Sequence, residues 1–465
     1  MRFASTVVVL IGVLAAGWAS AGTGQSTDRS LAPQGAAARE SDPADVAAVV
    51  KAYCAGCHNG VMRSPSGALL DRFDTASLSA NPDVWSRAYR QLQAGTMPPV
   101  GAPRPARAVS DAVLASIEAA LGADAPPPAD ATHQEIAGRL ALLLWNSTPD
   151  ALLLQDAGRG RLTDAATLER HVRRMLGDDR ARAFVARFFF PWLGLDRLGQ
   201  ADPDRKAFPG FTVSLRDAMA METELFLLSQ LREDRDPIEM WSANYTFLNE
   251  ALARHYGVSG VAGAPFRRVS LPGPERAGLL GHGSIHMVTS RHQHGTDAAY
   301  TSPAARAMWV RLHFLGAPPP RPFPGAQPVR PELPITPQTR TLPAEPCVNC
   351  HRNFFPLGYA LENFDPIGRW RTHDQAGPVD ASGAFVDGMP TNGVVELREA
   401  LLSRPDAFRT TIVERLIVHA SGAPAASRTT PDSLFRARQV LRGVKSPRWS
   451  SLLASIVRAK PPAAP

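Results

Sequence analysis

The 465-residue sequence has only four cysteines, no dense run of Lys or Arg, and no long hydrophobic run after its N-terminus. Because a membrane-spanning helix needs about 20 apolar residues, the last absence excludes a multi-span membrane protein. Lys and Arg total 50 and Asp and Glu total 43, so the net charge of +7 is modest and does not indicate a nucleic-acid partner. The sequence also lacks the glycine-rich motifs of dinucleotide and phosphate binding and the G-x-S-x-G motif of hydrolases.

The N-terminus has the organisation of an export signal. A positively charged start precedes an apolar run over residues 7–16, and small residues in an A-x-A arrangement end at Ala21. This pattern predicts a secretory signal peptide over residues 1–21, with an uncleaved anchor as the alternative. Residues 22–40 are rich in Gly, Ser and Ala and predict a mobile leader. We therefore expect a periplasmic or secreted protein without a stable membrane span.

The four cysteines form two C-x-x-C-H motifs. These motifs consist of Cys54, Cys57 and His58, and of Cys347, Cys350 and His351. In c-type cytochromes the two thiols of such a motif bind the haem vinyl groups, and the histidine ligates the iron. The sequence therefore predicts two covalently bound haem c groups, with one iron on His58 and the other on His351.

Other chemistry is open to four cysteines. Two disulfides, a redox-active C-x-x-C pair and a zinc site of four thiolates are the alternatives. The haem motif occurs twice, uses every cysteine and follows an export signal, and this combination favours haem attachment. Since haem attachment would consume all four thiols, we expect no disulfide in the mature protein.

Residues 41–123 have the pattern of a small haem domain. Asp42 and Pro43 predict the start of a helix that leads into the first motif. Met97 follows in a loop stiffened by two prolines, which suits a thioether as the second ligand of the iron. A packing methionine is the alternative.

Two further helices are expected in this first haem domain. Residues 82–92 carry apolar side chains at helical spacing, and a last helix is predicted between a cap at Ser110 and a stop at Gly122. The order of helix, haem motif, helix, methionine loop and helix resembles small class-I-like cytochrome c domains.

The rest of the chain predicts a mainly α protein. Residues 132–315 predict a mostly helical middle domain, including a helix over 165–176 and a buried aromatic cluster over 184–192. The proline-rich residues 316–346 predict a linker, and residues 347–465 predict the second c-type haem domain. The expected architecture is thus two cytochrome c-like helical haem domains flanking a larger helical region.

Several stretches resemble one bacterial family. Residues 144–150 read LWNSTPD, residues 245–250 read YTFLNE, and residues 361–371 read LENFDPIGRWR. They are similar to motifs of the planctomycete-type exported c-type cytochromes, whose chains carry the domains of unknown function 1592, 1588 and 1585. The resemblance implies a mostly helical, secreted or periplasmic haem protein, and it does not fix a substrate.

The sequence departs from that family pattern at three places. Phe355 and Pro356 stand where the family has Asp-Pro, and His419 stands where its last helix has a tyrosine. The segment around residues 291–294 is expanded.

Several residues compete to face the second iron. Met389 lies 38 residues after His351, close to the 39 residues that separate Met97 from His58, and this parallel favours Met389 as the ligand. The alternatives are His255, His373, His419 and an open coordination position.

Four further histidines occur close together in the middle region. They are His282, His286, His292 and His294. The first two would share a helix face and the last two a strand face, which suggests a metal site. Nearby glycines argue against a regular helix, and they favour a solvated or substrate-facing loop instead.

These observations favour a diheme electron-transfer protein. It would pass electrons between a periplasmic redox partner, such as an exported dehydrogenase, and the respiratory chain. The alternative is a haem oxidoreductase of peroxidase or oxygenase type, with one electron-transfer haem and one open catalytic haem, because the long middle region could build a pocket. A docking module that carries haem is a third possibility.

Overall fold

The computed structural model describes residues 45–61, 68–72, 78–123, 131–203, 205–291, 300–319, 354–374 and 377–459. The chain divides into two compact units at Ser41, and the first unit lies outside the described residues. The predicted signal peptide and leader therefore fall outside the description, as do Asp42 and Pro43.

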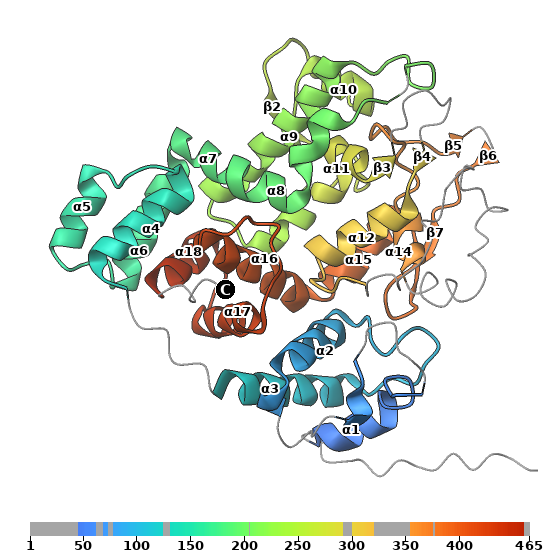
Figure 1. The fold of residues 1–465 in the computed structure, drawn as a ribbon. Coiled ribbons are helices and arrows are strands. Elements are labelled where there is room, and N and C mark those ends of the chain that lie inside the picture. The colour runs from blue at the N-terminus through green and yellow to red at the C-terminus, as the bar shows by residue number, and fades with distance from the viewer. Residues whose placement is uncertain are drawn as a thin grey trace, which may run out of the picture. The chain divides into compact units, whose positions relative to one another are not determined.

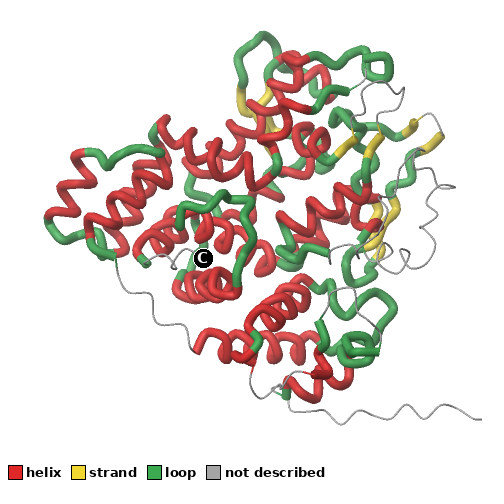
Figure 2. The backbone as a smooth tube through the Cα atoms, in the orientation of Figure 1, coloured by secondary structure: helices red, strands yellow, loops and turns green. Residues whose placement is uncertain are grey.

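The described chain is mainly helical, as predicted (Figures 1 and 2). The helices are α1 (Val46–Tyr53), α2 (Pro82–Ala94), α3 (Arg107–Ala123), α4 (His133–Trp145), α5 (Ala151–Gly158), α6 (Ala165–Gly177), α7 (Arg182–Phe184), α8 (Phe190–Leu193), α9 (Val213–Arg232), α10 (Glu250–Tyr256), α11 (Gly283–Val288), α12 (Pro303–His313), α14 (Phe355–Tyr359), α15 (Gly393–Leu402), α16 (Pro405–Ala420), α17 (Pro431–Gly443) and α18 (Trp449–Arg458). Short 3₁₀ turns lie at Leu70–Arg72, Leu78–Ala80, Asp179–Ala181, Leu195–Gln200, Pro237–Trp241 and Leu279–Gly281, and Val185–Phe189 forms a π-helical turn.

Strands are few and short. They are β1 (Tyr245–Leu248), β2 (Arg267–Ser270), β3 (Ser290–Arg291), β4 (Tyr300–Thr301), β5 (His373–Asp374), β6 (Gly377–Pro378), β7 (Ser382–Ala384) and β8 (Pro390–Asn392). Each strand pairs antiparallel with its neighbour in sequence, and Tyr245 lies opposite Ser270 in the longest pair. The strands therefore form local hairpins around a helical framework.

Local capping sets the helix boundaries. Asp164 accepts a hydrogen bond from the backbone of Thr167, so α6 begins where the predicted 165–176 helix begins. The expected cap at Ser110 is wrong, because its N–H donates to the carbonyl of Ala106 and α3 already starts at Arg107. Pro105, which has no amide donor, lies two residues before the first helical residue.

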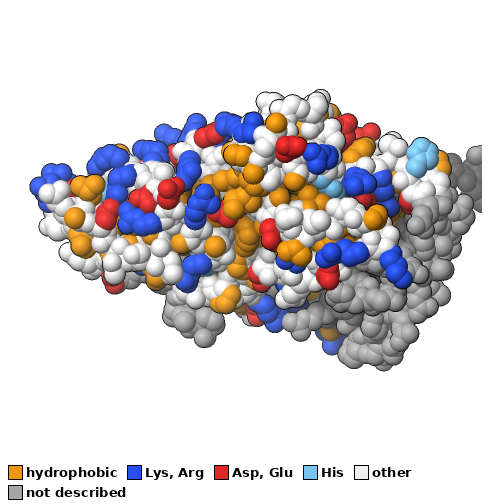
Figure 3. Space-filling model, turned by 90° about the horizontal axis from the view of Figure 1, so that it is seen from above, with side chains coloured by type: hydrophobic (Ala, Val, Ile, Leu, Met, Phe, Trp, Pro, Cys, Tyr) orange, Lys and Arg blue, Asp and Glu red, His pale blue; other side chains and the backbone are white. Residues whose placement is uncertain are grey.

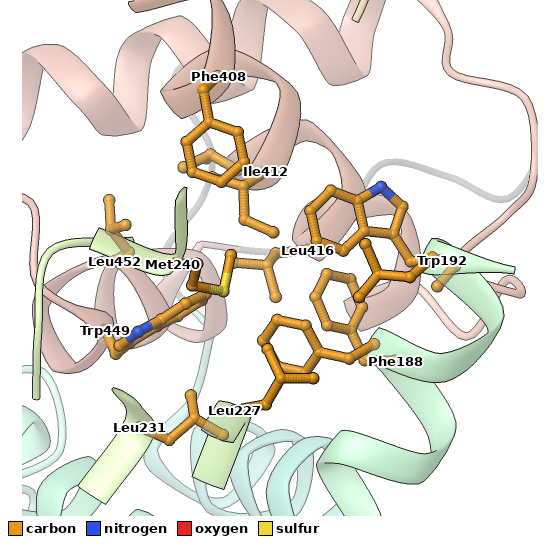
Figure 4. Close-up of a cluster of buried hydrophobic side chains, with 14 of the residues drawn as sticks. Phe188, Trp192, Leu227, Leu231, Met240, Phe408, Ile412, Leu416, Trp449 and Leu452 are labelled. Atoms are coloured by element: carbon orange, nitrogen blue, oxygen red, sulfur yellow. The ribbon is translucent and has the colours of Figure 1, made fainter. Parts of the chain in front are cut away.

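The main hydrophobic core joins the middle region to the C-terminal helices. The predicted aromatic cluster is buried in it, with Phe184, Phe188 and Phe189 fully enclosed. Figure 4 shows side chains of α9, α16 and α18 converging on this cluster. The residues labelled there are Phe188, Trp192, Leu227, Leu231, Met240, Phe408, Ile412, Leu416, Trp449 and Leu452.

A separate hydrophobic cluster holds the first three helices together. It includes Val50 of α1, Trp85 of α2 and Ile117 of α3, and it is completed by Phe435 of α17. Tyr89 and Phe435 meet edge to face with ring centroids 6.3 Å apart. The N-terminal helices are thus packed against a C-terminal helix through shared core residues.

The surface mixes charges of both signs. In the view of Figure 3, Lys and Arg side chains alternate with Asp and Glu, and hydrophobic side chains form a band across the middle of the face. Among the described residues, none of the helices has the length and apolar character needed to cross a membrane.

Candidate functional site

The first cysteine motif is a tight turn at the end of α1. Asp45 caps the start of this helix by accepting a hydrogen bond from the N–H of Ala48. The backbone N–H groups of Cys57 and His58 then both donate to the carbonyl of Cys54, at 3.1 and 2.9 Å. The three residues of the motif therefore lie on one tight backbone turn.

The two thiols of this turn differ in their surroundings. Cys54 is partly buried against the cluster of α1–α3, whereas Cys57 is exposed. Burial, with a smaller contribution from Cys57, raises the pKa of Cys54 to about 11. Neither thiol forms a disulfide in the described part of the chain.

His58 is oriented by a backbone carbonyl. Its Nδ1 lies 3.1 Å from the carbonyl oxygen of Ala68. When Nδ1 carries the proton and donates it to this oxygen, Nε2 is the nitrogen that can ligate a metal, and such orientation is typical of ligating histidines. Two thiols and an oriented histidine are the set of groups that covalent haem attachment needs.

The hydrophobic cluster against which Cys54 packs contains a buried donor. Trp85 of α2 is 1% exposed, and its indole Nε1 has no hydrogen-bond partner among the described residues. A buried donor without an acceptor is costly. An acceptor such as a haem propionate would satisfy it, so the residues of this site fit the predicted group.

Met97 lies in the loop that follows α2. Gly95 ends the helix in the left-handed conformation with φ of 71°, and the N–H of Met97 donates to the carbonyl of Gln91. The side chain of Met97 is half-buried. The loop is thus anchored on the helix that supplies Trp85.

The second motif lies outside the described residues. This applies to Cys347, Cys350 and His351, and the description resumes at Phe354. Met389 is 49% exposed, and its N–H donates to Asp387 Oδ1 at 3.1 Å. The exposed thioether stands in the turn before β8, where it is open to a further group.

The three rival histidines lie in different surroundings. His255 Nε2 is 2.9 Å from the carbonyl oxygen of Ile367, and burial lowers the pKa of His255 to about 4. His373 is exposed on β5. His419 is half-buried near the end of α16, with its ring 5.4 Å from that of Phe188. The structure does not bring these three together.

The prediction of a solvated loop around His282 and His286 is wrong. Both side chains are 1% exposed, and they lie at the start of α11 and within it. His286 stacks on Phe364 with ring centroids 4.0 Å apart, and its Nε2 lies 2.9 Å from the carbonyl oxygen of Leu280. The loop signal came from local glycines, whereas the burial comes from a partner distant in sequence.

Neither of these histidines forms part of a metal cluster in the described chain. Within that chain, no group of three or more His, Cys, Asp or Glu side chains is placed to hold a metal ion. His292 and His294 lie outside the described residues. Burial lowers the pKa of His282 to about 3, so its imidazole is neutral in the folded protein.

The sequence did not predict a functional role for Glu222, a buried acid near His282. Glu222 of α9 is 1% exposed and accepts hydrogen bonds from Thr246 and Tyr256, each at 2.6 Å. Burial raises the pKa of Glu222 to about 7. In the sequence Glu222 stands two residues before a second acidic residue, Glu224, and nothing local distinguishes the buried acid from the one paired at the surface.

Hydroxyl groups extend this buried network toward His282. Thr223 Oγ1 lies 3.0 Å from His282 Nδ1 and 2.7 Å from Ser284 Oγ. His282 Nε2 has no partner among the described residues. Arg276 covers the ring of Tyr256 at 3.8 Å and donates to the carbonyl of Gly368. We call Glu222, Thr223, Tyr256, Arg276, His282 and Ser284 the buried polar cluster.

Comparison with protein families gives two matches. Residues 131–258 match PSD4, described as a protein of unknown function (DUF1592), and residues 276–374 match PSCyt3, described as a protein of unknown function (DUF1588). The chain therefore carries two of the domains named by the sequence resemblance. No curated protein and no solved structure matches the chain.

The buried polar cluster lies where these two matched segments meet. Glu222 and Tyr256 belong to the first segment, and Arg276, His282 and Gly368 belong to the second. The signature at residues 361–371 packs here: Phe364 stacks on His286, and the carbonyl of Gly368 accepts from Arg276.

Proposed function

We propose that the chain is an exported diheme c-type cytochrome. It transfers electrons between a periplasmic redox partner, such as a dehydrogenase, and the respiratory chain. The observation that carries this proposal is the first cysteine turn, where two unpaired thiols precede a histidine whose Nδ1 lies 3.1 Å from a backbone carbonyl. The hydrogen bond at Nδ1 leaves Nε2 of this histidine as the nitrogen that would ligate the iron.

Each residue of the first site has a defined role in this proposal. Cys54 and Cys57 would form the covalent tethers, and His58 and Met97 would be the two ligands of the iron. The haem supplies reversible one-electron chemistry when bound. The apolar cluster of α1–α3 would exclude water from it, and ligation by the thioether of Met97 would raise its potential.

The second site has the same arrangement in the proposal. Cys347 and Cys350 attach the second haem, and His351 and Met389 ligate its iron. Iron with two protein ligands has no open position for a substrate, so both groups would pass electrons rather than transform a molecule.

A haem oxidoreductase is the second candidate, and the buried polar cluster favours it. A carboxyl group whose pKa is raised to about 7 is suited to taking up and releasing a proton near neutral pH. Perturbed acids of this kind are concentrated at functional sites. In this candidate the second haem keeps an open position, and Met389 is not a ligand.

The spin state of the ferric protein decides between the two candidates. Electron transfer through two six-coordinate groups predicts two low-spin signals that do not change with cyanide or peroxide. The test is electron paramagnetic resonance and optical spectroscopy of the purified holoprotein, with each ligand added in excess. One high-spin signal that shifts with cyanide would contradict the electron-transfer proposal and support the oxidoreductase.

A further inference from the structure

A cavity of about 430 Å³ lies beside α18. It is enclosed by α6, by α18 and by residues 443–448, which link α17 to α18. The two enclosing helices pack side by side (Figure 1). Small-molecule sites of proteins have volumes of about 300–1,000 Å³, so this cavity is large enough for a small organic ligand. We call it the α6–α18 cavity.

The lining of the α6–α18 cavity carries an excess of positive charge. Lys445, Arg448 and Arg458 contribute three cationic side chains, and Glu169 is the only acid among the described lining residues. The carboxylate of Glu169 is already paired, because it accepts from Arg173 Nη1 at 3.3 Å. A cleft lined by one sign of charge concentrates ions of the opposite sign, so this cavity attracts anions.

The backbone at the two ends of α18 is satisfied by residues outside the cavity. At the start of the helix, Asp234 Oδ1 accepts from the N–H of Ser450 at 2.7 Å, and its Oδ2 accepts from Ser450 Oγ at 2.7 Å. At the end of the helix, Arg139 donates to the carbonyls of Val457 and Ala459. The cationic groups of the cavity are therefore not needed to cap this helix.

Two cationic groups and one hydroxyl in the lining have no hydrogen-bond or ion-pair partner among the described residues. They belong to Lys445, Arg458 and Ser455. Arg448 is held in place, because its Nη1 donates to the carbonyl of Asp234 at 3.0 Å. Hydrogen bonds from guanidinium and ammonium groups to carboxylates are stronger than those between neutral groups. A carboxylate ligand would therefore supply strong acceptors for these donors.

The spacing of the cationic groups favours a ligand with two acidic ends. Arg448 precedes α18 and Arg458 is its last residue, so a rise of 1.5 Å per residue separates their Cα atoms by about 15 Å. Leu168 and Ala454 add apolar surface to the lining, which suits an aliphatic chain. We propose that the α6–α18 cavity binds an organic dicarboxylate, with one carboxylate on Arg458 and the other on Lys445 and Arg448.

The proposal is tested by isothermal titration calorimetry of the full protein with suberate, an aliphatic dicarboxylate. Octanoate, which has the same chain and a single carboxylate, and inorganic phosphate are the comparison ligands. Arg458→Ala and Lys445→Ala each remove one cation, and Arg458→Lys keeps the charge without the bidentate fork. Arg170→Ala is the matched control, because Arg170 is an exposed arginine of α6 that is not part of the lining.

We expect saturable binding of suberate that weakens about tenfold in Arg458→Ala and in Lys445→Ala. Arg458→Lys should recover part of the affinity, and Arg170→Ala should bind as the parent protein does. Since Lys445 and Arg458 have no partner among the described residues, both alanine variants should unfold at the temperature of the parent protein. This measurement separates a loss of binding from a loss of folding.

Three results would overturn the proposal. They are the absence of saturable suberate binding, an equal loss of affinity in Arg170→Ala, and binding of octanoate or phosphate as tight as that of suberate. Each of these results would leave the proposed function intact, because the described residues assigned to the haem sites do not line the α6–α18 cavity.

Discussion

Met97 is proposed to ligate the iron of the first haem through its thioether sulfur. A thioether ligand on iron gives weak far-red absorption and raises the midpoint potential. We predict that Met97→Ala abolishes this absorption at one haem and lowers its potential, as measured by potentiometric titration. Met389→Ala is the control, because it should change the other haem only. An unchanged spectrum in Met97→Ala would remove Met97 as a ligand.

Glu222 makes a testable contribution to the pH dependence of stability. Burial raises the pKa of Glu222 from 4.5 to about 7 in the folded protein. Between these values the folded protein holds a proton that the unfolded chain has released. The contribution of Glu222 to stability therefore falls as pH rises from about 4.5 to about 7, and it stays low above that range.

We predict that Glu222→Gln removes this fall. The free energy of unfolding is measured with urea for both proteins at pH 5 and at pH 8. The difference between the variant and the parent protein should favour the variant more at pH 8 than at pH 5. Glu224→Gln is the control, since Glu224 lies on the same helix and pairs with Arg182 at the surface. A stability difference between Glu222→Gln and the parent that does not vary with pH would contradict the prediction.

Contacts between helices contribute to the stability of the fold, and one of them is a buried ion pair. Arg90 of α2 and Glu414 of α16 form a buried ion pair at 2.5 Å, with both side chains less than a tenth exposed. Removing one partner leaves the other charge buried without compensation. We predict that Arg90→Met lowers the free energy of unfolding by about 3 kcal/mol.

A double-mutant cycle isolates the Arg90–Glu414 interaction. Glu414→Gln removes the second charge while keeping an acceptor for Ser433, which donates to Glu414 at 2.9 Å. The double variant should lose less stability than the sum of the two single variants in urea unfolding. Additive losses would show that the pair does not couple α2 to α16.

Gly358 determines how closely α14 approaches α12. A Cβ atom at this position would lie 2.0 Å from the backbone carbonyl oxygen of Pro303, and a backbone atom cannot move aside easily. We predict that Gly358→Ala destabilises the protein by about 2 kcal/mol or more, measured by thermal unfolding. Gly138→Ala in α4 is the control: no atom lies within 4 Å of its Cβ, so greater helix propensity should stabilise it by up to about 1 kcal/mol.

The helices that were predicted correctly are those with strong local signals. The helix predicted over residues 165–176 is α6, because Asp164 caps it and its apolar residues share one face. The cap expected at Ser110 is wrong because serine is also tolerated in the first turn of a helix, and α3 begins three residues earlier, at Arg107. Local patterns therefore identify the element more securely than its first residue.

The buried polar cluster could not be predicted from local sequence. Glycines around His282 and His286 indicate a loop, yet Thr223 and Phe364 enclose these histidines from positions 59 and 78 residues away from them. The Arg90–Glu414 pair likewise joins residues that are distant in sequence. Partners that are distant in sequence leave no periodic signal, so only the three-dimensional structure reveals them.

Across the whole molecule, both candidate functions depend on two porphyrins bound covalently outside the cytosol. The predicted export signal, both cysteine motifs and the oriented His58 are consistent with this arrangement. The most direct test is the intact mass of the mature protein purified from a host with a cytochrome c maturation system. We predict a mass equal to the processed polypeptide plus two haems, reduced by one haem in the Cys54→Ala/Cys57→Ala variant. A mass equal to the polypeptide alone would contradict the proposal.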